Sequence, residues 1–357
     1  MILNNLRIFR HSLHHNALTV GSMRTLYSEK DLGVSDYESR RLEAVKRGGE
    51  YCQPDTVLKK MKFQLRSENI EELIQTLKIW IHVVDTKQCK KHFSLLKDCL
   101  DFIYNNPHPD PAKKNYNFPP TVMRMFHLLN MPDEALNIAA NIKNKDMFNQ
   151  HNSTIILCDL LFNNGMYKEL IYVVENANAV NAKRGMKSSY LQNCITFAAC
   201  YKLNTQDHLS YALEIWNKSV KEHQLSQAIN FLCMNAINLN QPEIALEILR
   251  PSDKHFTSLY IRLIALSDCG KYAEAAQVLR SGLNQQIFSN IPASVVNRIR
   301  QNLNKCLPAE DADNFNNLLN EVQHQKTKIT IDEILCWPIA LNLKKFDIDR
   351  HRYHQTN

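Results

Sequence analysis

The sequence predicts an all-α protein, an α-solenoid of helix-turn-helix repeats with helical caps. One observation is an internal echo, because GMYKEL at 165–170 returns as GKYAEA at 270–275, 105 residues later. A second echo pairs NMPDEAL at 130–136 with NQPEIAL at 240–246, 110 residues apart. Both separations are about three times 35 residues, which indicates one helical hairpin repeated along the chain. The third observation is composition, since 8 Gly and 12 Pro in 357 residues are few for an all-β fold.

Bulk properties exclude several classes of protein. The most apolar stretch, 70–84, is interrupted by Lys78 and His82, so a transmembrane helix is not expected. The ten cysteines include no Cys-x-x-Cys pair, which favours buried thiols in a reducing compartment over a disulfide framework or a structural zinc site. The formal net charge of +7 is too small to identify a nucleic-acid binder by itself.

The N-terminal residues have the composition of a mitochondrial transit peptide. Arg7, Arg10 and Arg24 all precede the first acidic residue, Glu29, and the apolar residues at 3, 6, 8, 9 and 13 can share one helix face. We therefore expect residues 1–27 to be a transit peptide that is cleaved near 26–28, just after Arg24. A disordered basic arm is the alternative.

Residues 28–111 are expected to form an N-terminal helical region. A charged helix should end at the glycines 48–49, and helices should follow at 54–66, 69–84 and 86–104. Within the second of these, apolar residues at 70, 73, 74, 77 and 81 form one stripe that needs a neighbour. The prolines at 107, 109 and 111 end the region, because they exclude a helix interior.

Residues 112–285 are expected to form five helical hairpins. The first pairs 120–129 with 132–143, the second lies between 153 and 176, and the third pairs 191–203 with 208–220. The fourth pairs 227–239 with 242–249, and the fifth pairs 256–268 with a helix through 279. Each hairpin turns on a residue type that tolerates the left-handed conformation, glycine or asparagine. The turn residues, spaced by 35, 39, 36 and 30 residues, are Asn130, Gly165, Asn204, Asn240 and Gly270.

Beyond residue 285 the period lapses. Residues 286–340 are expected to form C-terminal capping helices at 291–306 and 311–323, because an array needs terminal units with a polar outer face. A short final helix should run from Thr330 to Cys336, with Thr330 as its cap because Glu333 lies three residues on. Residues 341–357 carry several basic residues and are expected to be a flexible tail.

A helical hairpin of about 35 residues, with Gly or Asn at the turn and a small residue five places later, resembles the pentatricopeptide repeat. The tetratricopeptide repeat has a similar period, but the Trp and Gly pattern of its first helix is absent. More narrowly, DLLF at 159–162 and FAACYKLN at 197–204 resemble animal mitochondrial members of the pentatricopeptide repeat family. The resemblance implies a right-handed solenoid, a mitochondrial matrix location, and a role in RNA maturation and so in respiratory-chain expression.

The resemblance also implies where RNA would bind. In this family the first helices of the repeats line a groove, and each repeat reads one base of single-stranded RNA. The main base-reading place lies ten residues before the turn residue, on Pro120, Ile155, Cys194, Asn230 and Tyr260. Only Asn230 is of a type that normally reads a base, so sequence-specific readout along the whole array is doubtful. Tyr260 could stack on a base, although a tyrosine on a repeat helix is more often a core residue.

Basic residues near helix ends are the candidate phosphate contacts. If they line one groove, counterion release would supply affinity that does not depend on sequence. The alternative is a set of scattered, solvated charges. These candidates are Lys113, Lys114, Lys143, Lys145, Lys183, Arg184, Lys187 and Lys202.

Catalytic signatures are missing from the sequence. It contains no HExxH, Walker loop, GxSxG elbow or clustered Asp set, so we expect no enzyme, no cofactor and no metal site. His351 and His354 could bind a metal if the tail were helical, but a floppy basic tail is the simpler interpretation. The favoured hypothesis is a non-catalytic factor that binds single-stranded mitochondrial RNA. The alternative is a helical protein-binding scaffold, for example a subunit of a mitochondrial ribosomal or RNA-processing complex.

Overall fold

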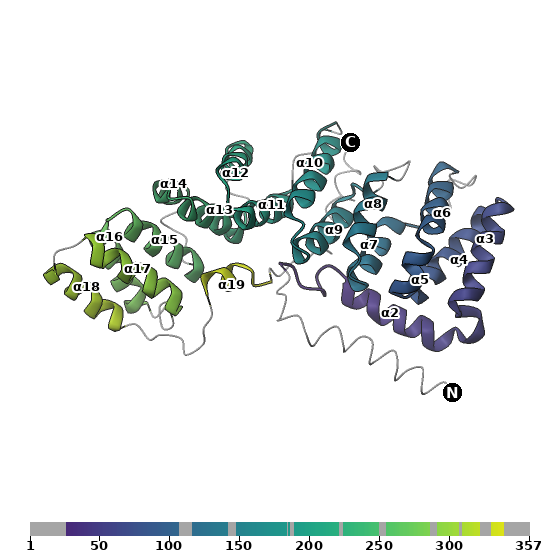
Figure 1. Cartoon of the computed structure of the whole chain (residues 1–357), viewed down its shortest axis with the longest axis horizontal. Helices are drawn as coiled ribbons and strands as arrows, with labels where there is room; N and C mark the ends of the chain where they lie inside the picture. The colour runs from purple at the N-terminus through teal and green to yellow at the C-terminus, as the bar shows by residue number, and fades with distance from the viewer. Residues whose placement is uncertain are drawn as a thin grey trace, which may run out of the picture.

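The computed structural model describes residues 26–106, 116–141, 148–183, 185, 189–220, 224–249, 255–285, 291–306, 309–321 and 330–338. Within these residues the regular structure comprises eighteen α-helices, α2 to α19, and one 3-10 helix, with no strand among the elements. The helices stack side by side into an elongated array (Figure 1). The prediction of an all-α helical-repeat solenoid is confirmed.

The N-terminal region packs as a helical group against the first repeat. It comprises α2 (Val34–Arg47), η1 (Gly49–Cys52), α3 (Pro54–Arg66), α4 (Ile70–Val83), α5 (Thr86–Lys91) and α6 (Phe93–Asn105). In the apolar stripe of α4, Ile70 is partly buried and the other four residues are buried, as the spacing predicts. Helix α4 packs against α2, α3, α6 and α7. The single helix predicted over 86–104 is wrong, because the chain breaks at His92, with φ −117° and ψ 24°. No Gly or Pro marks this break.

Five helical hairpins follow in the predicted order. They are α7 (Phe118–Leu128) with α8 (Pro132–Asn141), α9 (His151–Asn163) with α10 (Tyr167–Lys183), α11 (Tyr190–Leu203) with α12 (Gln206–Lys218), α13 (Ser226–Asn238) with α14 (Pro242–Ile248), and α15 (Phe256–Asp268) with α16 (Tyr272–Asn284). The first helices pack in sequence, α7 on α9, α9 on α11, α11 on α13 and α13 on α15. We call this continuous row the first-helix row. The second helices α8, α10, α12 and α14 lie along one side of it (Figure 1).

The five predicted turn residues all adopt the left-handed conformation. Their φ angles are 50° at Asn130, 73° at Gly165, 49° at Asn204, 57° at Asn240 and 70° at Gly270. At Gly165 the turn closes with two bonds, from Met166 N–H to the Leu161 carbonyl at 3.0 Å and from Gly165 N–H to the Phe162 carbonyl at 3.1 Å. This is the Schellman pattern, and the same pair of bonds recurs at residues 130, 240 and 270. The turn assignment is confirmed.

The C-terminal helices do more than cap the array. Helix α17 (Ala293–Cys306) packs on α15, and α18 (Ala309–Asn320) packs on both α17 and α16, so this pair extends the stack as a sixth hairpin. Helix α19 (Ile331–Leu335) instead returns to the middle of the molecule and lies against α13 and α15 (Figure 1). Thr330 and Glu333 form the predicted capping box at its start.

Three of the first helices, α9, α11 and α13, are buried on every side over most of their length. All residues from 191 to 201 of α11 and from 228 to 237 of α13 are buried. An amphipathic surface helix keeps a polar face in water, and these helices have none over that length. The second helices cover one side of the first-helix row. Other parts of the first-helix row are covered by two segments that are distant from it in sequence. One contains Leu26 and Tyr27, and the other is α19.

Candidate nucleic-acid interface

Asn230, the candidate base reader of α13, lies inside the array. Its side chain is 1% exposed, and its Oδ1 accepts a hydrogen bond from Ser258 Oγ of α15 at 2.9 Å. The bond joins two neighbouring first helices, which satisfies a polar group that would otherwise be costly to bury. A base edge therefore reaches Asn230 only after the surrounding contacts open.

Tyr260, the candidate stacking residue of α15, is also largely buried. Its ring lies 5.8 Å from that of Phe256 in an edge arrangement with an interplanar angle of 64°. Burial raises the pKa of its hydroxyl to about 12, so the group stays protonated. Phe256 lies one helical turn earlier, on the same face of α15.

The other three base-reading places are interior as well. Ile155 and Cys194 are 0% exposed, and Pro120 is buried in the first turn of α7. All five places thus share one structural setting, the inside of the first-helix row. As observed, they act as packing residues.

Two of the eight basic residues proposed as phosphate contacts, Lys183 and Lys202, lie in the part of the chain that the structure describes. Lys183 is exposed at the end of α10, a second helix, whereas Lys202 lies near the end of α11 in the first-helix row. The structure does not bring these two together in one contact. The remaining candidates lie outside the described residues, as do His351 and His354 of the expected tail. They are Lys113, Lys114, Lys143, Lys145, Arg184 and Lys187.

Lys202 has two partners. Its Nζ lies 3.3 Å from the Asp332 carboxylate of α19 and 5.3 Å from the centroid of the Tyr201 ring. The ion pair is partly exposed, so solvent screens it. Partial burial, with a further contribution from neighbouring Glu333, raises the pKa of Asp332.

Helix α19 and the residues after it attach to the first helices through few groups. Gln227 of α13 donates through Nε2 to the carbonyl oxygens of Leu335 and Trp337, the latter at 3.0 Å. The Trp337 ring lies 6.4 Å from the Phe256 ring of α15. Leu335 is 1% exposed, whereas Trp337 is 36% exposed. The segment thus contacts α11 through an ion pair, α13 through hydrogen bonds and α15 through an aromatic ring.

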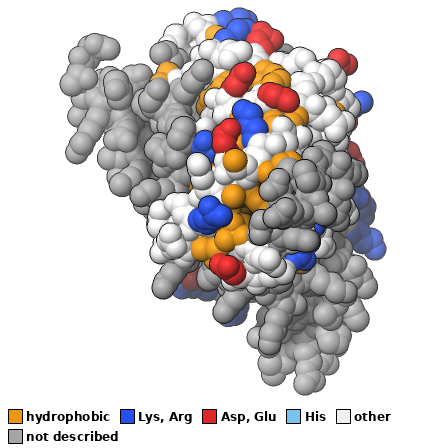
Figure 2. Space-filling model, turned by 90° about the vertical axis from the view of Figure 1, so that its left-hand side faces the viewer, with side chains coloured by type: hydrophobic (Ala, Val, Ile, Leu, Met, Phe, Trp, Pro, Cys, Tyr) orange, Lys and Arg blue, Asp and Glu red, His pale blue; other side chains and the backbone are white. Residues whose placement is uncertain are grey.

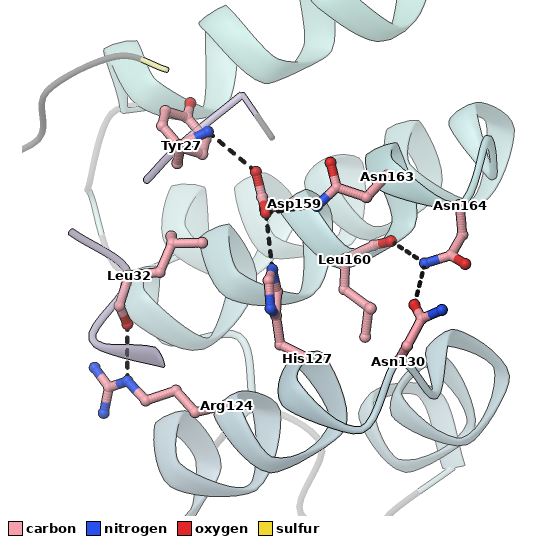
Figure 3. A network of polar contacts seen from close by, with 9 residues as sticks. All are labelled: Tyr27, Leu32, Arg124, His127, Asn130, Asp159, Leu160, Asn163 and Asn164. Atoms are coloured by element: carbon pink, nitrogen blue, oxygen red, sulfur yellow. Dashed lines mark hydrogen bonds and ion pairs between the residues drawn. The ribbon is translucent and has the colours of Figure 1, made fainter. Parts of the chain in front are cut away.

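A second polar network, absent from the sequence predictions, holds the N-terminal residues to the array (Figure 3). Asp159 of α9 is 0% exposed, and its carboxylate accepts bonds from His127 Nε2 at 2.8 Å, Asn163 Nδ2 at 3.0 Å and the Tyr27 backbone N–H at 3.2 Å. Since a carboxylate can only accept, the His127 Nε2 carries the proton in this bond. A polar residue inside an otherwise apolar helix segment was the signal available in the sequence.

Tyr27 and Arg124 complete this attachment. The Tyr27 hydroxyl donates to the Leu191 carbonyl of α11 at 3.0 Å, and burial raises the pKa of this hydroxyl well above its usual range. Arg124 Nε of α7 donates to the Leu32 carbonyl at 2.8 Å. Residues 26–33 are therefore part of the folded array.

The surface charge at one end of the array is mixed. Figure 2 shows the end of the array that lies on the left in Figure 1, where α16, α17 and α18 are found. A narrow band of apolar side chains crosses it, with basic and acidic side chains interspersed. This face presents no continuous basic patch in its described residues.

Comparison with known proteins identifies relatives. No family model matches the chain, and no solved structure matches it. The chain is 24% identical over 261 residues to pentatricopeptide repeat-containing protein 2, mitochondrial, of Mus musculus, covering 69% of this chain and 65% of that protein. The proteins of the same name from Danio rerio and Xenopus laevis are 23% identical over 352 residues and 22% over 322 residues. These two matches cover 92% and 80% of this chain, and 86% and 81% of the relatives.

The chain is therefore similar, at low identity, to proteins named pentatricopeptide repeat-containing protein 2, mitochondrial. The match spans slightly less than two thirds of the mouse protein, and 39% of the human one. All these relatives are named mitochondrial. In the part of the chain that the structure describes, no helix is long and apolar enough to cross a membrane, and no three His, Cys, Asp or Glu side chains are grouped to hold a metal ion.

Proposed function

We propose that this protein is a non-catalytic mitochondrial RNA-binding factor. The observation that carries the proposal is the continuous first-helix row, built from hairpins with left-handed turns, in a relative of pentatricopeptide repeat proteins. In such arrays the first helices present the surface that single-stranded RNA follows. The protein would act in the maturation of mitochondrial transcripts in the matrix, and thereby in respiratory-chain expression.

The RNA would be held mainly through its phosphates. Lys202 is the described basic candidate on the first-helix row, and Lys183 flanks it on a second helix. Lys113, Lys114, Lys143, Lys145, Arg184 and Lys187 are proposed to add phosphate contacts. Contacts of this kind release counterions and give affinity without sequence preference. Tyr260 would stack on a base and Asn230 would read one, both after the row has opened.

A binding titration across a salt series tests the proposal. The mature chain is titrated with a labelled single-stranded RNA, beside the variants Lys202→Gln and Lys218→Gln. Lys218 on α12 is a matched control, because it is also a lysine paired with an acidic residue, Glu214. The logarithm of the binding constant falls linearly with the logarithm of the salt concentration, and the loss of one phosphate contact in Lys202→Gln should make this slope about 0.7 shallower. The slope of Lys218→Gln should equal that of wild type. Absence of binding to the wild-type chain at low salt would refute the proposed function.

The transit peptide is proposed to end earlier than the sequence pattern indicated. Leu26 and Tyr27 are 0% exposed, and Tyr27 bonds to both α9 and α11. A mature chain that began at Ser28 would lose both residues from the core. We expect cleavage at or before the bond between residues 25 and 26. Mass spectrometry of the N-terminal peptide from isolated mitochondria checks this, and a first residue at 27 or later would contradict it.

A second candidate function is a protein-binding scaffold. The observation that favours it is the burial of all five base-reading places, which leaves RNA no exposed base contact among them. Helical solenoids present extended surfaces to proteins as readily as to RNA. Affinity purification from mitochondria separates the two functions, since protein partners that persist after ribonuclease treatment support the scaffold.

A further inference from the structure

The face of the first-helix row formed by α11, α13 and α15 is occupied by the chain itself. The occupant is the segment 330–337, which includes α19, and which we call the return segment. Gln227 lies 108 residues before Leu335 in the chain and 110 before Trp337, so its bonds to them close a long loop. Ile334, Leu335 and Cys336 are all under 9% exposed.

The return segment lies beside the candidate RNA contacts. Gln227, which bonds the segment, precedes Asn230 by three residues on α13, and Phe256, which contacts Trp337, precedes Tyr260 by four residues on α15. Residues three or four apart share a helix face. The third candidate, Lys202, is paired directly with Asp332 of the segment.

The groups that the return segment presents match those of a nucleotide. Asp332 places an anion on Lys202, where a phosphate would lie, and Trp337 places a flat ring beside Phe256, next to the stacking candidate. Phosphate contact and stacking on aromatic side chains are the two sources of affinity for single-stranded nucleic acid. The segment and an RNA strand therefore need the same partners.

The return segment is short, and its two ends are partly exposed although its centre is buried. Its helix has five residues, its ion pair is partly exposed, and its terminal Trp337 keeps 36% of its surface in water. Elements with few buried contacts open at low free energy compared with the core of a domain. The first-helix row, by contrast, has ten or more consecutive buried residues in α11 and in α13.

We propose that the return segment covers the RNA-binding face of α11, α13 and α15, and that single-stranded RNA binds there by displacing it. This inference rests on the proposed function, because it names the surface and the step that controls access to it. An equilibrium in which the segment is docked nine-tenths of the time weakens RNA binding about tenfold, since the apparent dissociation constant scales inversely with the open fraction.

The test compares two full-length variants. Leu335→Ser removes the most buried anchor of the return segment, and Leu319→Ser removes an equally buried leucine from α18, which lies elsewhere. Both are titrated with the same labelled single-stranded RNA at one salt concentration. We expect Leu335→Ser to bind about tenfold more tightly than wild type, and Leu319→Ser to bind as wild type does.

Hydrogen exchange supplies a readout that needs no substitution. Adding RNA to the wild-type chain should speed exchange in 330–337 and slow it in α13 and α15. If wild type binds RNA, Leu335→Ser binds no more tightly, and exchange in 330–337 does not rise, the inference is overturned while the proposed function stands. If neither wild type nor Leu335→Ser binds RNA, the proposed function fails and the inference fails with it.

Discussion

Replacing Asp159 with alanine tests the network that joins the N-terminal residues to the array. The carboxylate is 0% exposed and accepts bonds from His127, Asn163 and the Tyr27 N–H. Alanine would leave the Tyr27 and His127 donors buried without an acceptor, and each such donor costs about 1–3 kcal/mol. Two such donors together give an expected loss of about 2–6 kcal/mol in the free energy of unfolding for Asp159→Ala.

Urea unfolding followed by circular dichroism measures this loss. Asn163→Ala is the matched control, since it removes one bond to the same carboxylate from a residue that is only partly buried and should cost about 1 kcal/mol. Hydrogen exchange of Tyr27 should accelerate in Asp159→Ala and not in Asn163→Ala. A loss below about 1 kcal/mol for Asp159→Ala would show that the buried bonds are not what holds residues 26–33.

Three further substitutions or treatments probe other features. Gly165→Val should lower the free energy of unfolding by about 1–2 kcal/mol, because a branched side chain is strained at a left-handed residue. Gly165→Asn should lower it less, because asparagine tolerates this conformation. Equal stabilities of the two variants would contradict the role of Gly165 as a turn residue. Burial, with a smaller contribution from Arg40 and Arg41, lowers the pKa of His82 below its usual 6.5. The unfolded chain therefore binds this proton more tightly than the folded chain does, and the urea midpoint should fall as the pH drops below 6.5. His82→Gln should flatten that dependence, and an unchanged slope would contradict the assignment. Burial raises the pKa of the Cys200 thiol to about 12, so iodoacetamide should not label it in the folded chain at neutral pH; rapid labelling there would contradict its burial.

The repeat turns could be predicted from sequence because their cause is local. Asn130, Gly165 and the three later turn residues are the types that accept a positive φ, and the structure has positive φ at each. The capping box at Thr330 was predicted for the same reason, since its bonds join residues three apart. Where one residue type satisfies one backbone requirement, sequence is sufficient.

Contacts between distant segments could not be predicted in this way. Nothing near Leu335 in the chain indicates that its carbonyl accepts a bond from Gln227, which lies 108 residues earlier. The packing of α17 and α18 as a further hairpin was also missed, because Pro308 stands between them where earlier hairpins have Gly or Asn. Tyr27 was assigned to the presequence on composition, although its contacts belong to the fold.

Ultraviolet cross-linking can show whether RNA lies on the first-helix row. The mature chain is irradiated with a single-stranded RNA that contains 4-thiouridine, digested, and mapped by mass spectrometry. We expect adducts in α11, α13 and α15, with Tyr260 and the neighbourhood of Lys202 among the labelled sites, and more adducts in Leu335→Ser than in wild type. Adducts confined to the second helices or to the N-terminal helices α2 to α6 would contradict it.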